Sequence, residues 1–188
     1  MARGATIYVF DIRLADADRN VYETLSLRIA QHPSETEEYL LTRVLAYCLE
    51  YTEGIAFSSG GLSNPDEPAI SVRDLTGALQ TWIEVGAPDA ARLHKASKAA
   101  QRVAVYAHKQ VGLLLAKLNG ERIHRGDAIA IYAMDPDLLS ALVARLARRM
   151  QFDLSVSEGE LYITIGADTL SGALRPIRML PQAPSASR

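Results

Sequence analysis

The stretch LQTWIEVG, which runs from Leu79 to Gly86, predicts a β-strand with a carboxylate, Glu84, near its end. Pro88 and Asp89 follow closely and are typical of the start of a helix, which carries Lys95. A carboxylate in an apolar strand is costly unless a cation or a hydrogen-bond donor accompanies it. Glu84 is therefore the first candidate for a functional residue.

Further acidic residues come shortly before this strand. The turn Asp74–Gly77 predicts a hairpin with a shorter strand over residues 69–73, in a register that places Glu67 opposite Glu84. A one-residue bulge, which the two nearby prolines favour, would place Asp66 there instead. Opposed side chains lie about 5 Å apart at Cβ, and carboxylates that close favour a proton or a metal ion between them. The hairpin therefore predicts an acidic, metal-binding cleft.

The order of elements predicts a single α/β or α+β domain, a mixed β-sheet flanked by helices, over residues 1–166. Strands are expected over residues 5–14, 21–30, 69–73, 78–85, 103–106, 128–133, 152–156 and 160–165, and helices over 34–50, 88–100, 108–118 and 136–150. Ser34 is the expected N-cap of the first helix, with Glu37 completing a capping box. Residues 167–188 are rich in proline and small polar residues, which predicts an extended or disordered tail.

Composition limits the possible environments and partners. Of the 188 residues 48% are hydrophobic, which excludes wholesale disorder. The formal charge of −2 makes tight non-specific binding to nucleic acid unfavourable outside a local basic patch. Cys48 is the only cysteine, so no intrachain disulfide framework exists, and without a signal peptide we expect a reducing cytoplasm. The longest apolar run, 111–116, is too short to span a bilayer, and we expect no membrane partner.

Several segments resemble the YaeQ family of bacterial proteins, whose physiological role is unassigned. The matching segments are Ala30–Thr36, Asp66–Pro68, Asp74–Gly77, Trp82–Gly86 and Arg92–Ala96. The resemblance covers most of residues 5–166 and implies a variant of the PD-(D/E)XK nuclease core. It also implies a site at Glu38, Asp66, Glu84 and Lys95. The superfamily pattern has a lysine where this chain has Gly86, and Lys95 on the next helix is a candidate to replace it.

The first interpretation is a metal-dependent phosphodiesterase, nuclease-like, that acts on nucleic acid. Mg²⁺ or Mn²⁺ would be held by Asp66 and Glu84, with Glu38 through water and Glu67 as a further candidate ligand. Such a metal lowers the pKa of a bound water and neutralises charge on the phosphate. Lys95 would orient the nucleophile or stabilise the transition state.

A second interpretation is a catalytically degenerate nuclease fold that binds nucleic acid or a protein, and a third is a scaffold without metal. Each residue also has a structural alternative: Glu84 would pair with Arg92 or Lys95, Asp66 would belong to a turn, and Glu38 would favour the helix dipole of the first turn. Gly86 and the acidic pI of about 6.1 favour the second interpretation, whereas the clustering of acids favours the first.

Overall fold

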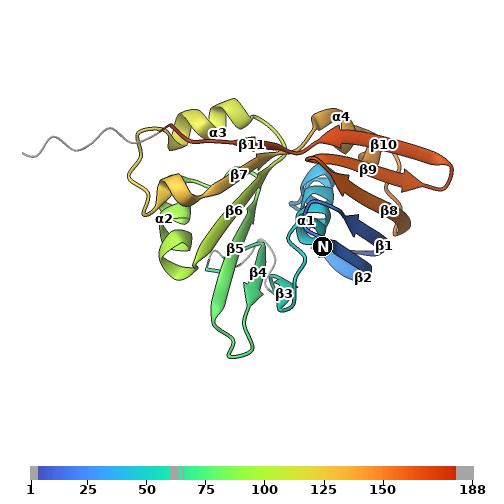
Figure 1. Cartoon of the computed structure of the whole chain (residues 1–188), viewed down its shortest axis with the longest axis horizontal. Helices are drawn as coiled ribbons and strands as arrows, with labels where there is room; N and C mark the ends of the chain where they lie inside the picture. Colours follow the sequence, from blue (N-terminus) through green and yellow to red (C-terminus); the bar gives the residue numbers. More distant parts are fainter. Residues whose placement is uncertain (1–3, 60–63, 65, 181–188) are drawn as a thin grey trace, which may run out of the picture.

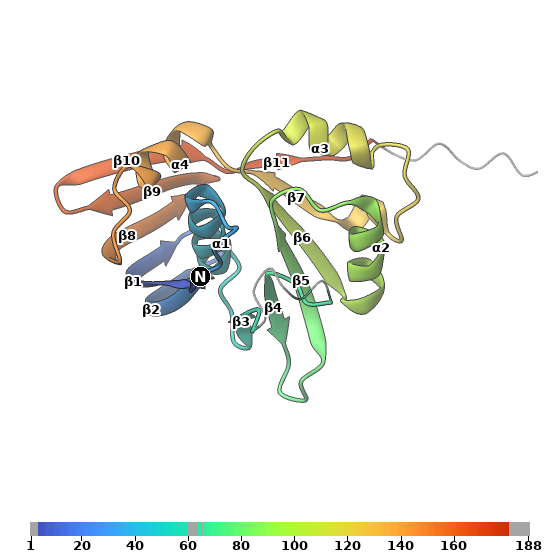
Figure 2. The ribbon, with the colours of Figure 1, turned by 180° about the vertical axis from the view of Figure 1, so that it is seen from behind.

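The computed structural model describes residues 4–59, 64 and 66–180, and it contains two β-sheets instead of the one that the sequence predicts. The two sheets lie on either side of a central helix (Figures 1 and 2). The chain forms a single α+β domain with mixed sheets flanked by helices. No helix within the described ranges is long and apolar enough to cross a membrane.

The first sheet joins the two ends of the chain. Its strands are β1 (Thr6–Asp16), β2 (Val21–Gln31), β8 (Arg149–Ser157), β9 (Glu160–Ile165) and β10 (Asp168–Ala173), in the order β10-β9-β8-β1-β2. Only β1 and β8 run parallel, while the other neighbours are antiparallel. Tyr8, Phe10, Ile12 and Leu14 alternate with more exposed residues along β1, because one face of the sheet packs on the core and the other meets solvent.

The second sheet holds the middle of the chain and one later strand. Its strands are β3 (Ile55–Phe57), β4 (Ile70–Arg73), β5 (Leu79–Val85), β6 (Arg102–Ala107), β7 (Ala130–Ala133) and β11 (Arg175–Ile177), in the order β11-β7-β6-β5-β4-β3. The central strands β5, β6 and β7 are parallel. Residues 82–85 of β5 are buried on both faces, as is typical of a parallel strand covered by helices.

The helices determine which face of each sheet is buried. α1 (Glu37–Leu49) lies between the sheets (Figure 1), and with α4 (Pro136–Val143) it shares one core with the inner faces of both. α2 (Ala90–Ala99) and α3 (Val111–Leu118) cover the other face of the second sheet, where a separate apolar cluster includes Trp82. A short 3₁₀ helix over Gly126–Ala128 precedes β7. Glu84 therefore lies in a strand that has helices on both sides.

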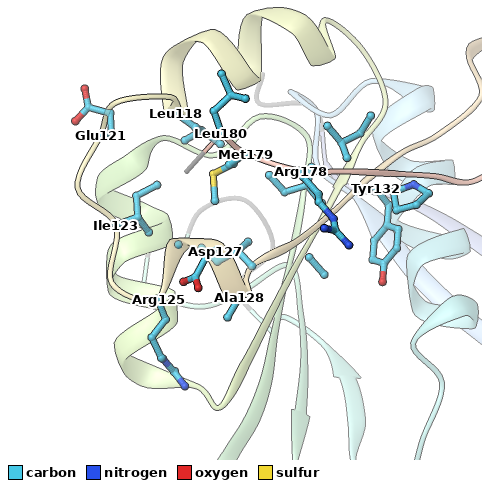
Figure 3. Close-up of a pocket in the computed structure, with 16 residues that line it drawn as sticks. Leu118, Glu121, Ile123, Arg125, Asp127, Ala128, Tyr132, Arg178, Met179 and Leu180 are labelled. Atoms are coloured by element: carbon cyan, nitrogen blue, oxygen red, sulfur yellow. The ribbon is translucent and has the colours of Figure 1, made fainter. Parts of the chain in front are cut away.

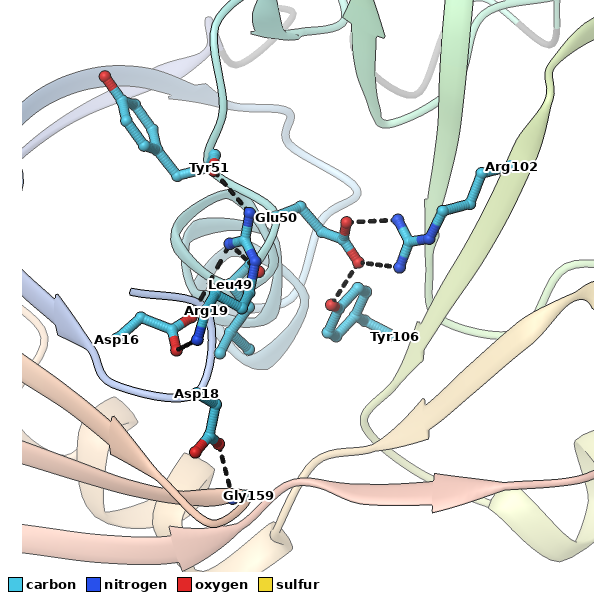
Figure 4. A network of polar contacts seen from close by, with 9 residues as sticks. All are labelled: Asp16, Asp18, Arg19, Leu49, Glu50, Tyr51, Arg102, Tyr106 and Gly159. Carbon is cyan, nitrogen blue, oxygen red and sulfur yellow. Dashed lines mark hydrogen bonds and ion pairs between the residues drawn. The ribbon is translucent and has the colours of Figure 1, made fainter. Parts of the chain in front are cut away.

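Hydrogen bonds connect the C-terminal end of α1 to both sheets (Figure 4). Glu50, just after α1, accepts two hydrogen bonds from the Arg102 guanidinium at 2.5 and 2.9 Å and one from the Tyr106 hydroxyl at 2.7 Å. Arg19, in the β1–β2 turn, donates to the carbonyl oxygens of Leu49 and Tyr51. The C-terminal end of α1 is thus held between the two sheets.

The expected β1–β2 hairpin, the β4–β5 hairpin, the helix after Asp89 and the β8–β9 hairpin are all confirmed. The N-cap of α1 was placed wrongly at Ser34: Thr36 accepts the hydrogen bond from the Tyr39 amide, whereas the Ser34 hydroxyl contacts His32. The short strand β3 was not predicted.

Two expectations about the last third of the chain are corrected. α4 ends at Val143 and not at residue 150, because the residues from Arg149 to Ser157 alternate with a period of two and pair with β1. Residues 168–177 do not form an unstructured tail, since β10 pairs with β9 and β11 pairs with β7. Residues 181–188, the rest of the predicted tail, lie outside the described ranges.

Candidate functional site

Glu84 is buried, with 4% of its surface exposed, and its carboxylate accepts two side-chain hydrogen bonds. Trp82 lies two residues earlier on the same face of β5 and donates its indole N–H to Glu84 Oε1 at 2.5 Å. Arg92, in the first turn of α2, donates its Nε–H to the same oxygen at 2.6 Å. The Arg92 guanidinium also lies over the Trp82 ring, 5.7 Å from its centroid, and donates to the Glu67 carbonyl oxygen.

The electrostatics of Glu84 reflect this burial. Removal from water raises the pKa of its carboxyl group, and the hydrogen bond from Trp82 and the charge of Arg92 act against that rise. The arrangement is a buried ion pair completed by an indole N–H. Of the alternatives given by the sequence, the pairing of Glu84 with Arg92 is the one found.

The expected opposition of Glu67 and Glu84 is corrected by the register of the β4–β5 hairpin. Ile70 pairs with Ile83, whereas the expected register pairs it with Thr81, and the register shifts between Val72 and Arg73. β4 begins only at Ile70, so Glu67 precedes the strand. Its carboxylate accepts a hydrogen bond from the Ser58 hydroxyl at 2.9 Å.

Asp66, Lys95 and Glu38 lie in more exposed positions than Glu84. Asp66 and Lys95 form an ion pair at the surface, with side chains 76% and 49% exposed, and the hydrogen bond from Lys95 lowers the pKa of Asp66. Glu38 is exposed in the first turn of α1, where its own backbone N–H lowers the pKa of its carboxyl group. The charges of Lys109 and His108 lower this pKa further.

A cavity of about 260 Å³ brings two of the predicted residues together near the carboxyl end of β5. We call it the strand-end cavity. It is lined by Glu35, Tyr39, Arg43, Ser58, Asn64, Glu67, Ala69, Glu84, Val85, Ala87, Pro88 and Arg92. Ligands of α/β sheets bind outside the carboxyl ends of the strands, so the location is suited to binding. Asp66, Glu38 and Lys95 do not line the cavity.

Three further lining residues were missed by the sequence analysis: Glu35, just before α1, and Tyr39 and Arg43, within it. Glu35 and Arg43 form a buried ion pair at 3.2 Å, and burial raises the pKa of Glu35. The Tyr39 ring lies near Gly86 at the end of β5, and burial raises the pKa of Tyr39 to about 12. The spacing of four residues between Tyr39 and Arg43 is the signal that places these two on one side of α1, whereas Glu35 precedes the helix.

Gly86 and His108 lie next to this cavity at the ends of β5 and β6. Gly86 has a φ of +94°, a conformation that is strained for any residue with a Cβ. A Cβ there would meet Tyr39 at 3.6 Å and His108 at 3.8 Å. Both ring nitrogens of His108 are buried without a hydrogen-bond partner in the described part of the chain, and burial lowers the pKa of its imidazole.

A sequence model of the YaeQ protein family matches residues 1–173. The chain belongs to the YaeQ family. The uncharacterised YaeQ protein of Escherichia coli is 30% identical over 165 residues, which cover 87% of this chain and 91% of that protein. The uncharacterised YaeQ protein of Salmonella typhi is 30% identical over 171 residues, which cover 90% of this chain and 94% of that protein.

Two solved YaeQ structures share the fold. The crystal structure of YaeQ from Pseudomonas syringae is 34% identical, with a TM-score of 0.82, and the match covers 92% of this chain and 96% of that one. The YaeQ structure from Xanthomonas axonopodis pv. citri is 31% identical, with a TM-score of 0.76, and the match covers 96% of this chain and 99% of that one.

The fit of a divalent metal can be tested on these side chains. Glu84 Oε1 already accepts two hydrogen bonds, one of them from a cation, and a metal at that oxygen would face the Arg92 guanidinium. Within the described ranges, no group of three or more His, Cys, Asp or Glu side chains could hold a metal ion. In this arrangement the predicted ligands Asp66, Glu67, Glu84 and Glu38 do not fit Mg²⁺ or Mn²⁺ as a set.

Proposed function

We propose that this protein is a binding module with a nuclease-like fold, a variant of the PD-(D/E)XK core, and that its strand-end cavity takes a side chain of a protein partner. The observation that carries the proposal is that the Glu84 carboxylate already accepts hydrogen bonds from the Trp82 indole and the Arg92 guanidinium. A carboxylate held in this way shapes and polarises a cavity without being free to bind a metal ion. The absence of a lysine at Gly86 supports the same choice.

The volume and charge of the cavity decide which kind of ligand we propose. Small-molecule pockets have volumes of roughly 300–1,000 Å³, so a cavity of about 260 Å³ suits one side chain better than a whole metabolite. Its lining has three carboxylates, on Glu35, Glu67 and Glu84, against two guanidinium groups. A phosphodiester would add further negative charge, whereas a cationic or neutral polar side chain would not. A protein segment that inserts an arginine is therefore our first choice.

A metal-dependent phosphodiesterase acting on nucleic acid is the second candidate. It is favoured by one observation, that Glu67 and Glu84 line the same cavity. It requires Arg92 to leave Glu84 so that a Mg²⁺ or Mn²⁺ ion can take its place. The two candidates therefore differ in whether the Glu84–Arg92 contact survives ligand binding.

The single tryptophan of the chain makes the test direct, because its indole N–H contacts Glu84. The probes are N-acetyl-arginine methylamide, its uncharged citrulline analogue, and a thymidine dinucleotide with Mn²⁺. We expect the arginine probe to shift the indole N–H resonance saturably, and more strongly than the citrulline analogue. Glu67→Gln should weaken this binding, whereas Asp127→Asn, which alters an exposed acid outside the lining of this cavity, should not.

The opposite result would reject the binding-module proposal. If the dinucleotide binds only with Mn²⁺ and the arginine probe leaves the Trp82 resonance unchanged, the phosphodiesterase is the better description. Chelator-sensitive cleavage that is lost in Glu84→Gln would then identify it as an enzyme.

A further inference from the structure

A second and larger cavity, of about 920 Å³, lies at the opposite edge of the second sheet (Figure 3). We call it the edge cavity. It is bounded by the end of α3, the 3₁₀ helix, β7, β11 and residues 178–180. None of its lining residues belongs to the strand-end cavity, so it is independent of the function proposed above.

Most residues that line the edge cavity are apolar, and the charged residues Glu121, Arg125, Asp127 and Arg178 lie among them. Leu118, Ile123, Ile129 and Ile131 are buried below it as part of the α2–α3 cluster, and Met179 packs against that cluster. The volume falls within the range of roughly 300–1,000 Å³ that small-molecule sites occupy. Such a lining favours a ligand with a hydrocarbon body, because its burial removes apolar surface from water.

One cation at this cavity is available to a ligand. Arg125 donates to the carbonyl oxygens of Ser97 and Ala100 and is used to close the end of α2. Arg178, in contrast, is exposed, and no hydrogen bond or ion pair joins it to another described residue. In Figure 3 its guanidinium lies near Tyr132, while Glu121 lies at the far end of the cavity.

We propose that the edge cavity binds an anionic amphiphile, a medium-chain carboxylate whose hydrocarbon chain lies along the apolar wall and whose carboxylate pairs with Arg178. The positive charge of Arg178 favours a carboxylate over a neutral lipid, because an arginine binds a carboxylate through two parallel hydrogen bonds. A cavity of about 920 Å³ has room for each of the chains tested below.

The test is calorimetric titration of the full chain with hexanoate, octanoate and decanoate, and with octanol as an uncharged control. We expect affinity to rise about fourfold per added methylene until the cavity is full. Arg178→Gln should weaken octanoate binding about tenfold and leave octanol binding unchanged. Arg175→Gln, which alters an exposed arginine outside the lining, is the matched control and should change neither.

A second variant tests the place of binding. Ala128→Phe puts a large side chain into the cavity from an exposed position, and it should abolish binding of both ligands with little change in melting temperature. Three results would overturn the proposal: no octanoate binding to the full chain, equal loss with Arg175→Gln, or full binding in Ala128→Phe.

Discussion

Replacing Glu84 by alanine should destabilise the protein by about 3 kcal/mol. The substitution removes the acceptor of two hydrogen bonds, from Trp82 Nε1 and Arg92 Nε. Hydrogen bonds to a charged group contribute about 1.5–3 kcal/mol each, and a buried donor left without a partner adds to the cost. The Trp82 indole would be such a donor, because Trp82 is only 2% exposed.

Two effects keep the loss below the sum of these contributions. The carboxylate of Glu84 no longer has to be buried, which returns part of the free energy that raised its pKa. The Arg92 side chain is 26% exposed, so its guanidinium can regain water when Glu84 is absent. For a chain of this size, about 3 kcal/mol corresponds to a fall in melting temperature of about 6–12 °C.

The measurement is urea and thermal unfolding at neutral pH without divalent ions, with Asp66→Ala as the matched control. Asp66 also pairs with a cation, Lys95, but at the surface, where water screens the pair, so its loss should change stability little. A double-mutant cycle of Glu84→Ala with Arg92→Ala should give a coupling of about 1–3 kcal/mol. A Glu84→Ala variant as stable as the wild type, or more stable, would refute this reasoning and favour a cluster of repelling, metal-binding carboxylates.

Three further changes test neighbouring features. Burial lowers the pKa of His108 in the folded state, so the imidazole binds a proton more readily in the unfolded state. The free energy of unfolding should therefore fall as the pH drops through about 6.5. Unfolding measured as a function of pH should show a smaller loss in His108→Phe. Gly86→Ala should cost about 1–2 kcal/mol in the free energy of unfolding, because its φ is +94° while the added Cβ has ordinary room. Tyr106→Phe should cost about 1–2 kcal/mol in urea unfolding by removing one hydrogen bond to Glu50, and no loss would mean that Arg102 alone satisfies this carboxylate.

Local patterns were sufficient to predict much of the fold. β1 and β2 alternate with a clear period of two and are joined by a polar turn, and all eleven residue pairs of their antiparallel ladder are formed. Asp89 caps α2 through its side chain, as a residue of this type does at a helix start. Glu84 was singled out because its burial in an apolar strand requires a partner, and that partner is present as Arg92.

Features that depend on distant parts of the chain could not be predicted in this way. The register of the β4–β5 hairpin depends on a shift between Val72 and Arg73 that no local signal specifies. The division into two sheets depends on the parallel pairing of β1 with β8, which are more than a hundred residues apart in the sequence. β11 contains Pro176, which reduces its strand signal but is tolerated at the edge of the sheet.

The conformation of Gly86 explains why the cation beside Glu84 is Arg92 and not a residue of β5. The positive φ at Gly86 turns the chain sharply at the end of β5, and a lysine at this position would be strained. The positive charge that compensates Glu84 comes instead from the first turn of the next helix, where the Asp89 side chain accepts a hydrogen bond from the Arg92 backbone N–H. Because this cation hydrogen-bonds directly to the carboxylate, it neutralises Glu84 in the resting protein. Any metal chemistry at Glu84 must first displace this cation.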